Sequence, residues 1–309
     1  MRISTSWSQQ AAVNSMLDQQ SNLQRTQMQL SSNKKLLTPS DDPTAAVRVL
    51  DLNQGIQQTQ QYQANITTAR QRLSLEGGVL QNATDVLQRI NELGVQGLNA
   101  TNSPSDRVTI AAEMEGLNQQ LLGLANTKNA NGEYLFAGFK NAAPPFGKDP
   151  VNTGAYVYAG DANSRLIQID SDRQITDGDD GLGVFGTPTG PLPATVPASG
   201  SMTNIFEGID QFIKDLKANA PVSASLDDIA KSLDKVLTAQ SSVGTRLNAL
   251  DRQQGYNDDA VLNMKTVLSA TEDLDYTEAI TRLSQQTLSL QAAQQAFTQV
   301  KKLSLFNYL

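Results

Sequence analysis

Residues 226–268, LDDIAKSLDKVLTAQSSVGTRLNALDRQQGYNDDAVLNMKTVL, carry the longest helical pattern of this chain. Apolar residues recur there at alternating spacings of three and four, the pattern of a helix face that packs along a second helix. Three polar residues, Gln240, Gln254 and Asn257, stand in the same register, where such residues fix helix alignment at some cost in stability. The stretch therefore predicts one long helix of a coiled-coil-like rod. The positions in register are Leu226, Ile229, Leu233, Val236, Gln240, Val243, Leu247, Leu250, Gln254, Asn257, Val261, Met264 and Leu268.

A second coiled-coil-like seam lies upstream, over residues 66–90. It predicts another long helix, whose weak point is Glu76-Gly77-Gly78 because glycine lowers helix stability. One column of this seam is Ile66, Leu73, Leu80 and Leu87, and the other is Ala69, Glu76, Ala83 and Ile90.

Two proline-containing pairs mark predicted helix starts. Asp42 is followed by Pro43, and Ser103 is followed by Pro104, with Asp106 in the first turn. Asp and Ser are favoured N-caps, and proline fits the first helical position because its missing N–H has no partner to lose there. We therefore expect helices to begin at both places.

Both chain ends carry thinner helical seams. Residues 5–37 are rich in Gln, Ser and Asn, and positions 20, 27 and 34 of the companion column are polar. Only half of a seam is present, so this helix needs a partner from elsewhere. The apolar columns of the two ends are Met16, Leu23, Leu30 and Leu37 at the N-terminus and Ile280, Leu283, Leu290 and Phe297 at the C-terminus.

Residues 138–202 differ from the rest, with many Pro and Gly and short alternating runs such as Tyr156-Val157-Tyr158. These features predict a small β-rich insert on a loop between helices. Because both flanks are helical, we expect the seams of the rod not to depend on this insert. The predicted segments are an N-terminal assembly helix (1–42), the first part of a helical rod (43–137), the β-rich insert (138–202), the second part of the rod (203–271) and a C-terminal assembly helix (272–309).

The composition excludes many functions. The 309 residues include 24 Lys+Arg and 31 Asp+Glu, a net charge of −7, and no Cys or His. Zinc sites, thiol nucleophiles, disulfides and imidazole bases all need Cys or His. Basic residues form no run longer than a pair, and no membrane-length apolar run exists, so neither nucleic acid nor a membrane is expected as a partner.

The N-terminal stretch lacks the apolar core of a cleaved signal peptide, which favours either a cytoplasmic location or export by another route.

One motif of the insert resembles a cofactor site. Gly181-Leu-Gly183-Val-Phe-Gly186 matches G-x-G-x-x-G, which cradles a dinucleotide when a strand precedes it and a helix follows. Here acidic residues precede the motif and Thr187-Pro188 follows it, so we expect no helix N-terminus and no cofactor.

The insert also carries an acidic cluster that does not match the calcium-binding EF-hand spacing. Acidic turn residues are the default interpretation, and no metal or catalytic residue is predicted. An adventitious calcium site and the carboxylate pair of a carbohydrate-active enzyme are the alternatives. The cluster consists of Asp170, Asp172, Asp177, Asp179 and Asp180.

Four segments near the chain ends carry a family resemblance. Met1–Thr5 and Leu30–Ala46 (LSSNKKLLTPSDDPTAA) resemble the N-terminal signature of the bacterial flagellin superfamily. Glu272–Ala279 (EDLDYTEA) and Leu283–Ala293 (LSQQTLSLQAA) resemble its C-terminal signature. The insert carries none of this resemblance.

Two further segments narrow the resemblance. Asn131–Phe139 (NGEYLFAGF) and Leu303–Leu309 (LSLFNYL) are similar to the hook-associated members of the superfamily. Asn33 stands where many relatives have Gly, and Asn is the other residue that tolerates a left-handed turn. We therefore expect the chain to bend at this position as in the family.

The resemblance implies a mainly α protein: an elongated coiled-coil-like helical rod made from both chain ends, with a small β-rich insert. It implies a structural adapter, not an enzyme, at the hook–filament junction of the bacterial flagellum; the alternative is a filament-forming flagellin. The implied partners are hook-associated protein 1, flagellin, identical subunits in a ring and a flagellar export chaperone. Export through the flagellar type III channel without a cleaved signal is also implied.

The assembly interface is expected at the two terminal columns. Because these seams are half polar, we expect both ends to fold only when stacked among neighbouring subunits. The interface residues are Met16, Leu23, Leu30, Leu37, Ile280, Leu283, Leu290, Phe297, Leu305 and Phe306.

Overall fold

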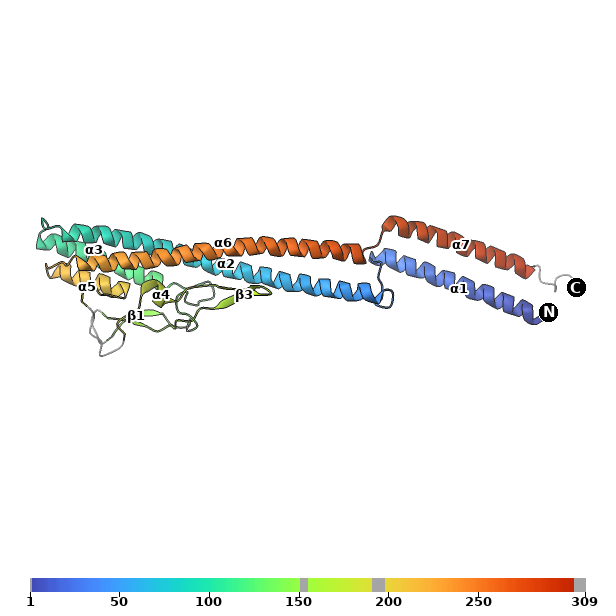
Figure 1. Cartoon of the computed structure of the whole chain (residues 1–309), viewed down its shortest axis with the longest axis horizontal. Helices are drawn as coiled ribbons and strands as arrows, with labels where there is room; N and C mark the ends of the chain where they lie inside the picture. The colour runs from blue at the N-terminus through green and yellow to red at the C-terminus, as the bar shows by residue number, and fades with distance from the viewer. Residues whose placement is uncertain (1, 151–154, 191–197, 303–309) are drawn as a thin grey trace. The chain divides into compact units, whose positions relative to one another are not determined.

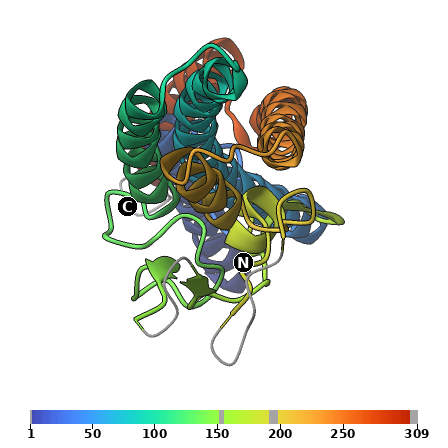
Figure 2. The same cartoon turned by 90° about the vertical axis from the view of Figure 1, so that its left-hand side faces the viewer.

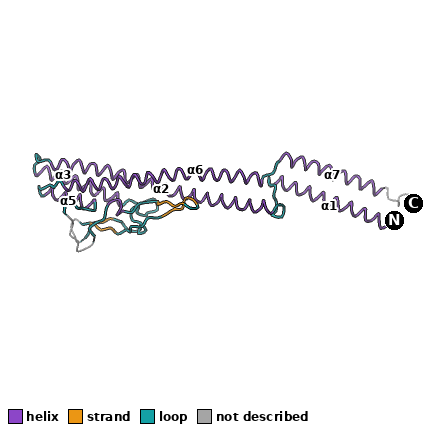
Figure 3. The backbone as a smooth tube through the Cα atoms, in the orientation of Figure 1, coloured by secondary structure: helices purple, strands orange, loops and turns teal. Residues whose placement is uncertain are grey.

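A computed structural model describes residues 2–150, 155–190 and 198–302 (Figure 1). Figure 3 shows that helices dominate and that the strands gather in one short region beside α2 (Pro43–Leu98). The expected mainly α fold with a small strand-containing insert is confirmed. The helices are α1 (Arg2–Ser32), α2 (Pro43–Leu98), α3 (Pro104–Ala125), α4 (Gly181–Phe185), α5 (Ile205–Lys217), α6 (Ala224–Glu272) and α7 (Tyr276–Lys302), and the strands are β1 (Phe146–Lys148), β2 (Tyr156–Tyr158), β3 (Leu166–Asp170) and β4 (Arg173–Thr176).

The contacts divide the chain into two compact units. The smaller unit comprises Met1–Thr59 and Asp259–Leu309, and the larger unit comprises Gln60–Asp258. Both divisions lie inside continuous helices, α2 and α6, and the insert belongs to the larger unit.

In the larger unit, α2 and α6 run antiparallel. Gln63 Nε2 donates a hydrogen bond to Gln254 O at 3.1 Å, whereas Gly94, further along α2, faces Leu226 near the start of α6. The seam predicted on α2 is confirmed, because all of its residues are buried, and α2 continues unbroken through the predicted weak point. Its buried residues are Ile66, Ala69, Leu73, Glu76, Leu80, Ala83, Leu87 and Ile90, and those of the α6 seam are Ile229, Val236, Val243, Leu250 and Asn257.

Helix α5 packs closely on α2 because two glycines of α2 lack side chains. A Cβ atom at Gly94 would lie 2.9 Å from Phe212, and one at Gly97 would lie 2.6 Å from Leu216. Helix α3 also packs against α5, and the end view in Figure 2 shows α2, α3, α5 and α6 side by side. These four helices form the scaffold of the larger unit.

The predicted helix caps are confirmed. Asp42 Oδ1 accepts the backbone N–H of Ala45 at 3.0 Å, which caps the start of α2. Ser103 Oγ accepts the N–H of Asp106 at 3.2 Å, and Asp106 Oδ2 accepts the N–H of Ser103 at 3.0 Å. This reciprocal capping box leaves fewer unsatisfied N–H groups at the start of α3.

The insert contains two separate antiparallel pairs of strands. Strand β1 pairs with β2, with Phe146 opposite Tyr158, and β3 pairs with β4, with Leu166 opposite Thr176. The register of the second pair shifts between Gln168 and Asp170. A two-stranded sheet is marginal alone, so both hairpins need the support of the helices.

Aromatic side chains join the insert to the helices. The Phe206 ring on α5 lies 5.2 Å from Phe146 and 5.3 Å from Tyr156, measured between centroids, and Phe146 lies 5.6 Å from Phe185. All four side chains are at most 2% exposed. The expectation that the seams of the rod do not depend on the insert is therefore wrong, because the insert supplies part of the same hydrophobic core.

In the smaller unit, α1 and α7 pack side by side in antiparallel orientation. Backbone hydrogen bonds join the connection that follows α1 to the one that precedes α7. Lys35 N–H donates to Glu272 O at 2.7 Å, and Leu274 N–H donates to Asn33 O at 3.3 Å. Asn33 has a φ of 57°, which confirms the expected left-handed bend. The two connections that lead into α2 and out of α6 are thus fastened to each other.

Candidate functional site

Apolar side chains line an open cavity of about 330 Å³ between α1 and α7. Met16 and Leu17 contribute from α1, and Leu290 and Phe297 contribute from α7. The two terminal columns predicted from the sequence therefore meet within one chain. A single chain leaves this seam incompletely packed, because the cavity remains open.

The described residues of the predicted assembly columns differ in exposure. Ile280 is 53% exposed, and the remainder are half-buried. Leu305 and Phe306 lie outside the described residues. The half-buried side chains are Met16, Leu23, Leu30, Leu37, Leu283, Leu290 and Phe297.

Sequence periodicity did not single out several exposed apolar side chains on the same helices. Leu17 and Met28 of α1 are 58% and 54% exposed, and Leu288 of α7 is 68% exposed. They stand outside the seven-residue columns, so the spacing rule gave no signal for them. The α1–α7 pair thus presents apolar surface on more than one side.

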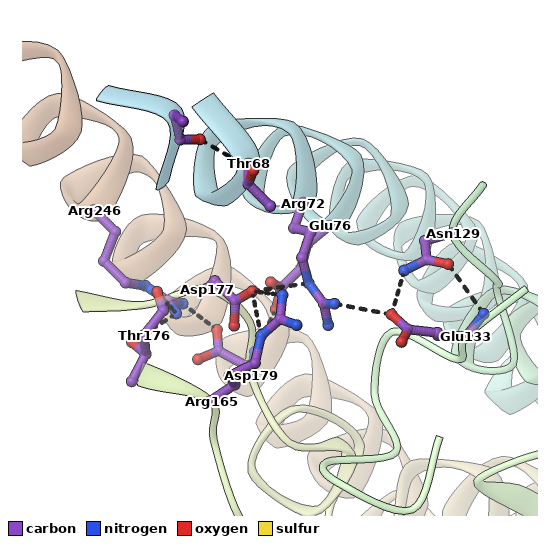
Figure 4. A network of polar contacts seen from close by, with 11 residues as sticks. Thr68, Arg72, Glu76, Asn129, Glu133, Arg165, Thr176, Asp177, Asp179 and Arg246 are labelled. Carbon is purple, nitrogen blue, oxygen red and sulfur yellow. Dashed lines mark hydrogen bonds and ion pairs between the residues drawn. The ribbon is translucent and has the colours of Figure 1, made fainter. Parts of the chain in front are cut away.

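A polar network fastens the insert to α2 (Figure 4). Asp177 is 1% exposed and accepts a hydrogen bond from Arg165 Nε at 2.9 Å. Arg72 of α2 holds the same carboxylate, with Nε 3.1 Å from Asp177 Oδ2, and places Nη1 3.1 Å from Glu133 Oε2. Asn129 donates to Glu133, and this hydrogen bond is the main reason why the pKa of Glu133 is below its usual value.

The same network reaches α6 through Arg246. This side chain forms an ion pair with Asp179 and donates from Nη1 to Thr176 Oγ1 at 3.1 Å. The Asp179 N–H donates to Glu76 Oε1 of α2 at 3.1 Å. The polar residue Glu76 is therefore accommodated in the core seam because its carboxyl group accepts a hydrogen bond from the backbone of the insert.

Burial is the largest effect on the Glu76 carboxyl. Burial and, second to it, the neighbouring Asp179 charge raise the pKa of Glu76, Arg246 opposes them, and the net result is a pKa of about 8. A carboxyl group in such a position stays protonated at neutral pH.

The glycine motif has a structural explanation. Residues 181–185 form the short helix α4, which begins within the motif, so the expectation of no helix N-terminus there is wrong. The side chain of Asp180 caps this helix by accepting the Gly183 N–H at 3.0 Å. A Cβ atom at Gly181 would lie 2.7 Å from Phe146, and Gly186 has a φ of 82°. The motif glycines thus permit close packing and a left-handed backbone.

The acidic cluster is used in structural contacts. Asp177 and Asp179 bind arginines, Asp180 caps α4, and Asp170 accepts a hydrogen bond from Gln253 at 3.1 Å. Among the described residues, no three acidic side chains converge in a way that could hold a metal ion. The arginine partners carried no sequence signal, because they stand at isolated helix or loop positions.

None of the described helices is long and apolar enough to cross a membrane. A family model described as the bacterial flagellin N-terminal helical region matches residues 3–141. Flagellar hook-associated protein 3 of Escherichia coli (strain K12) is 35% identical over 99% of this chain and 99% of its own length. The chain belongs to the flagellar hook-associated protein 3 family.

Two further comparisons agree with this family. The crystal structure of flagellar hook associated protein-3 from Legionella pneumophila has a TM-score of 0.63 at 23% identity, covering 71% of this chain and 97% of that one. This likeness bears on the fold. Flagellin D of Vibrio anguillarum is 32% identical over 38% of this chain and 32% of its own length. The match to the hook-associated family therefore extends along the whole chain, whereas this flagellin matches a part of it.

Proposed function

We propose that this protein is a structural adapter at the hook–filament junction of the bacterial flagellum. The observation that carries the proposal is the match along 99% of both chains to a flagellar hook-associated protein 3. An adapter needs surfaces that bind neighbouring subunits, and it needs no catalytic residues. The carboxylates of the insert suit this function, because they pair with Arg165 of the insert and Arg246 of α6 and so hold the protein together.

The assembly surface of this adapter is formed by α1 and α7. Their columns are only half-buried in one chain, and Leu17, Met28 and Leu288 are more than half exposed. Burying such side chains against neighbouring subunits is favourable by about 25 cal/mol for each Å² of apolar surface. The neighbours are identical subunits in a ring, hook-associated protein 1 on the hook side and flagellin on the filament side.

Export of this adapter proceeds through the flagellar type III channel without a cleaved signal, with a chaperone on the C-terminal helix. An amphipathic helix whose apolar column is incompletely covered is suited to a chaperone groove. The absence of Cys also suits export as an unfolded chain, because no disulfide has to form afterwards.

Immunogold labelling of isolated flagella tests the adapter function. We expect label at a single position between hook and filament in the wild-type cell. Label along the filament would overturn the proposal and favour the second candidate, a filament-forming flagellin, which the match to the flagellin N-terminal region supports. Electron microscopy of the purified protein under polymerising conditions is the complementary test, in which long filaments would also favour flagellin.

A further inference from the structure

Glu76 is an ionisable group in the core seam of α2. It is 2% exposed, and Ala69 and Ala83, one heptad before and after it in the same column, are fully buried. A charge without a partner is costly at such a position. The protonation state of Glu76 therefore affects how tightly the insert packs on α2.

The surroundings of Glu76 come from three parts of the chain. The insert contributes the N–H of Asp179, 3.1 Å from Oε1, and the Asp179 carboxyl, which is also hydrogen-bonded to the Glu76 side chain. Helix α6 contributes Arg246, and α2 itself contributes Arg72, one turn before Glu76. Asp177 and Arg165 of the insert complete the charged groups nearby, with Glu133 beyond Arg72.

The charges of this cluster balance without Glu76. Its three guanidinium groups are those of Arg72, Arg165 and Arg246, and its three other carboxylates are engaged with them. Ionised Glu76 would add a fourth negative charge next to Asp179, whereas the described cluster holds three guanidinium groups, each already engaged with another carboxylate. Neutral Glu76 can instead accept the Asp179 N–H and share its own proton with the Asp179 carboxylate. The three other carboxylates belong to Asp177, Asp179 and Glu133.

We propose that Glu76 is an acid–base latch that holds residues 177–180, the docking loop, against α2 and α6. The protonated side chain accommodates the loop, and its ionisation loosens the loop by repelling Asp179 inside the seam. This pH-dependent contact lies inside a single chain and is separate from the adapter function proposed above.

The direction of the pH dependence follows from proton linkage. In the docked state burial and the nearby Asp179 charge raise the pKa of Glu76 to about 8, whereas an opened loop returns it toward the usual value of 4.5. Between these values the opened state binds fewer protons than the docked state, so rising pH favours opening. The contribution of Glu76 to docking is greatest at about pH 5, weakens as pH rises, and levels off above about pH 8.

Hydrogen exchange of the docking loop tests the latch. The N–H group of Asp179 is hydrogen-bonded to Glu76 Oε1 of α2, so opening of the loop exposes it. Protection factors, corrected for intrinsic exchange, should be measured from pH 5.5 to 8.5 on the full chain. We expect protection of the wild-type loop to fall by up to about tenfold for each pH unit, because one proton is released on opening.

The variant Glu76→Gln should make loop protection independent of pH, since the amide stays neutral. Glu92→Gln is the matched control, because Glu92 is an exposed residue of the same helix, paired with Arg89, and should leave the wild-type slope unchanged. Equal slopes in the wild type and Glu76→Gln would overturn the latch. Should Glu76→Gln not fold, carbon-13 NMR of the wild-type glutamate carboxyls decides: a buried carboxyl that titrates well above 4.5 supports the latch, and none doing so overturns it.

Discussion

The core of the larger unit and the α1–α7 pair of the smaller unit are built on the same heptad logic but differ in completeness. In the larger unit, Leu73, Leu80 and Leu87 are fully buried within one chain. In the α1–α7 pair, the corresponding columns stay half-buried around an open cavity. A heptad repeat therefore specifies where a helix packs, but the number of neighbours decides whether the seam is closed.

The largest expected effect on single-chain stability is deletion of residues 142–200. This deletion removes Phe146, Tyr156 and Phe185, which pack around Phe206, so we expect the free energy of unfolding to fall by more than about 5 kcal/mol. Urea unfolding of the purified proteins measures this loss. An unchanged unfolding midpoint would show that the core of the larger unit is complete without the insert. It would contradict the role of the insert as part of that core.

Phe206→Ala should have the largest effect among single substitutions. The ring is fully buried among three aromatic partners, so its removal leaves a cavity and costs about 3–5 kcal/mol. Phe139→Ala is the matched control, because Phe139 is 59% exposed and should cost less than about 1 kcal/mol. Thermal unfolding followed by circular dichroism provides the measurement, and equal losses in the two variants would contradict the assigned core.

Ser103→Ala should lower the stability of the larger unit by about 1 kcal/mol, because it removes one half of the capping box of α3. Ser74→Ala, on the exposed face of α2, is the control and should change stability by less than about 0.5 kcal/mol. Chemical denaturation resolves this difference. A loss no larger than that of the control would mean that water replaces the cap.

Leu290→Asp should have the smallest effect on the isolated chain and a complete effect on assembly. Because Leu290 lines an open cavity, the monomer should lose less than about 1 kcal/mol, whereas a charge buried between subunits costs several kcal/mol in every copy. We expect cells that secrete this protein and unpolymerised flagellin while carrying bare hooks.

Two controls make the Leu290→Asp result specific. The amount of secreted variant must first be measured, because weaker chaperone binding would also remove it from the flagellum. Leu290→Met keeps the volume and apolar character of the side chain and should restore filaments. A Leu290→Asp monomer that unfolds several degrees below the wild type would show instead that the terminal seam is already closed in one chain.

Local sequence rules predicted much of this protein. The seam of α2, the cap at Asp42 and the left-handed turn at Asn33 all depend on residues within a few positions of one another. Such features can be identified before the chain partners are known, because helix periodicity and capping are properties of a short segment. The family resemblance likewise came from short contiguous segments near the two ends.

The contacts of the insert became visible only in the folded chain. Glu76 was predicted as part of a weak point in a helix, yet it receives the backbone of Asp179, which is 103 residues away. Arg246 and Arg72 meet the acidic cluster only after α2, α6 and the insert have packed together. Spacing along one helix cannot reveal such pairs, because ion pairing depends on which side chains are brought within a few ångströms by the fold.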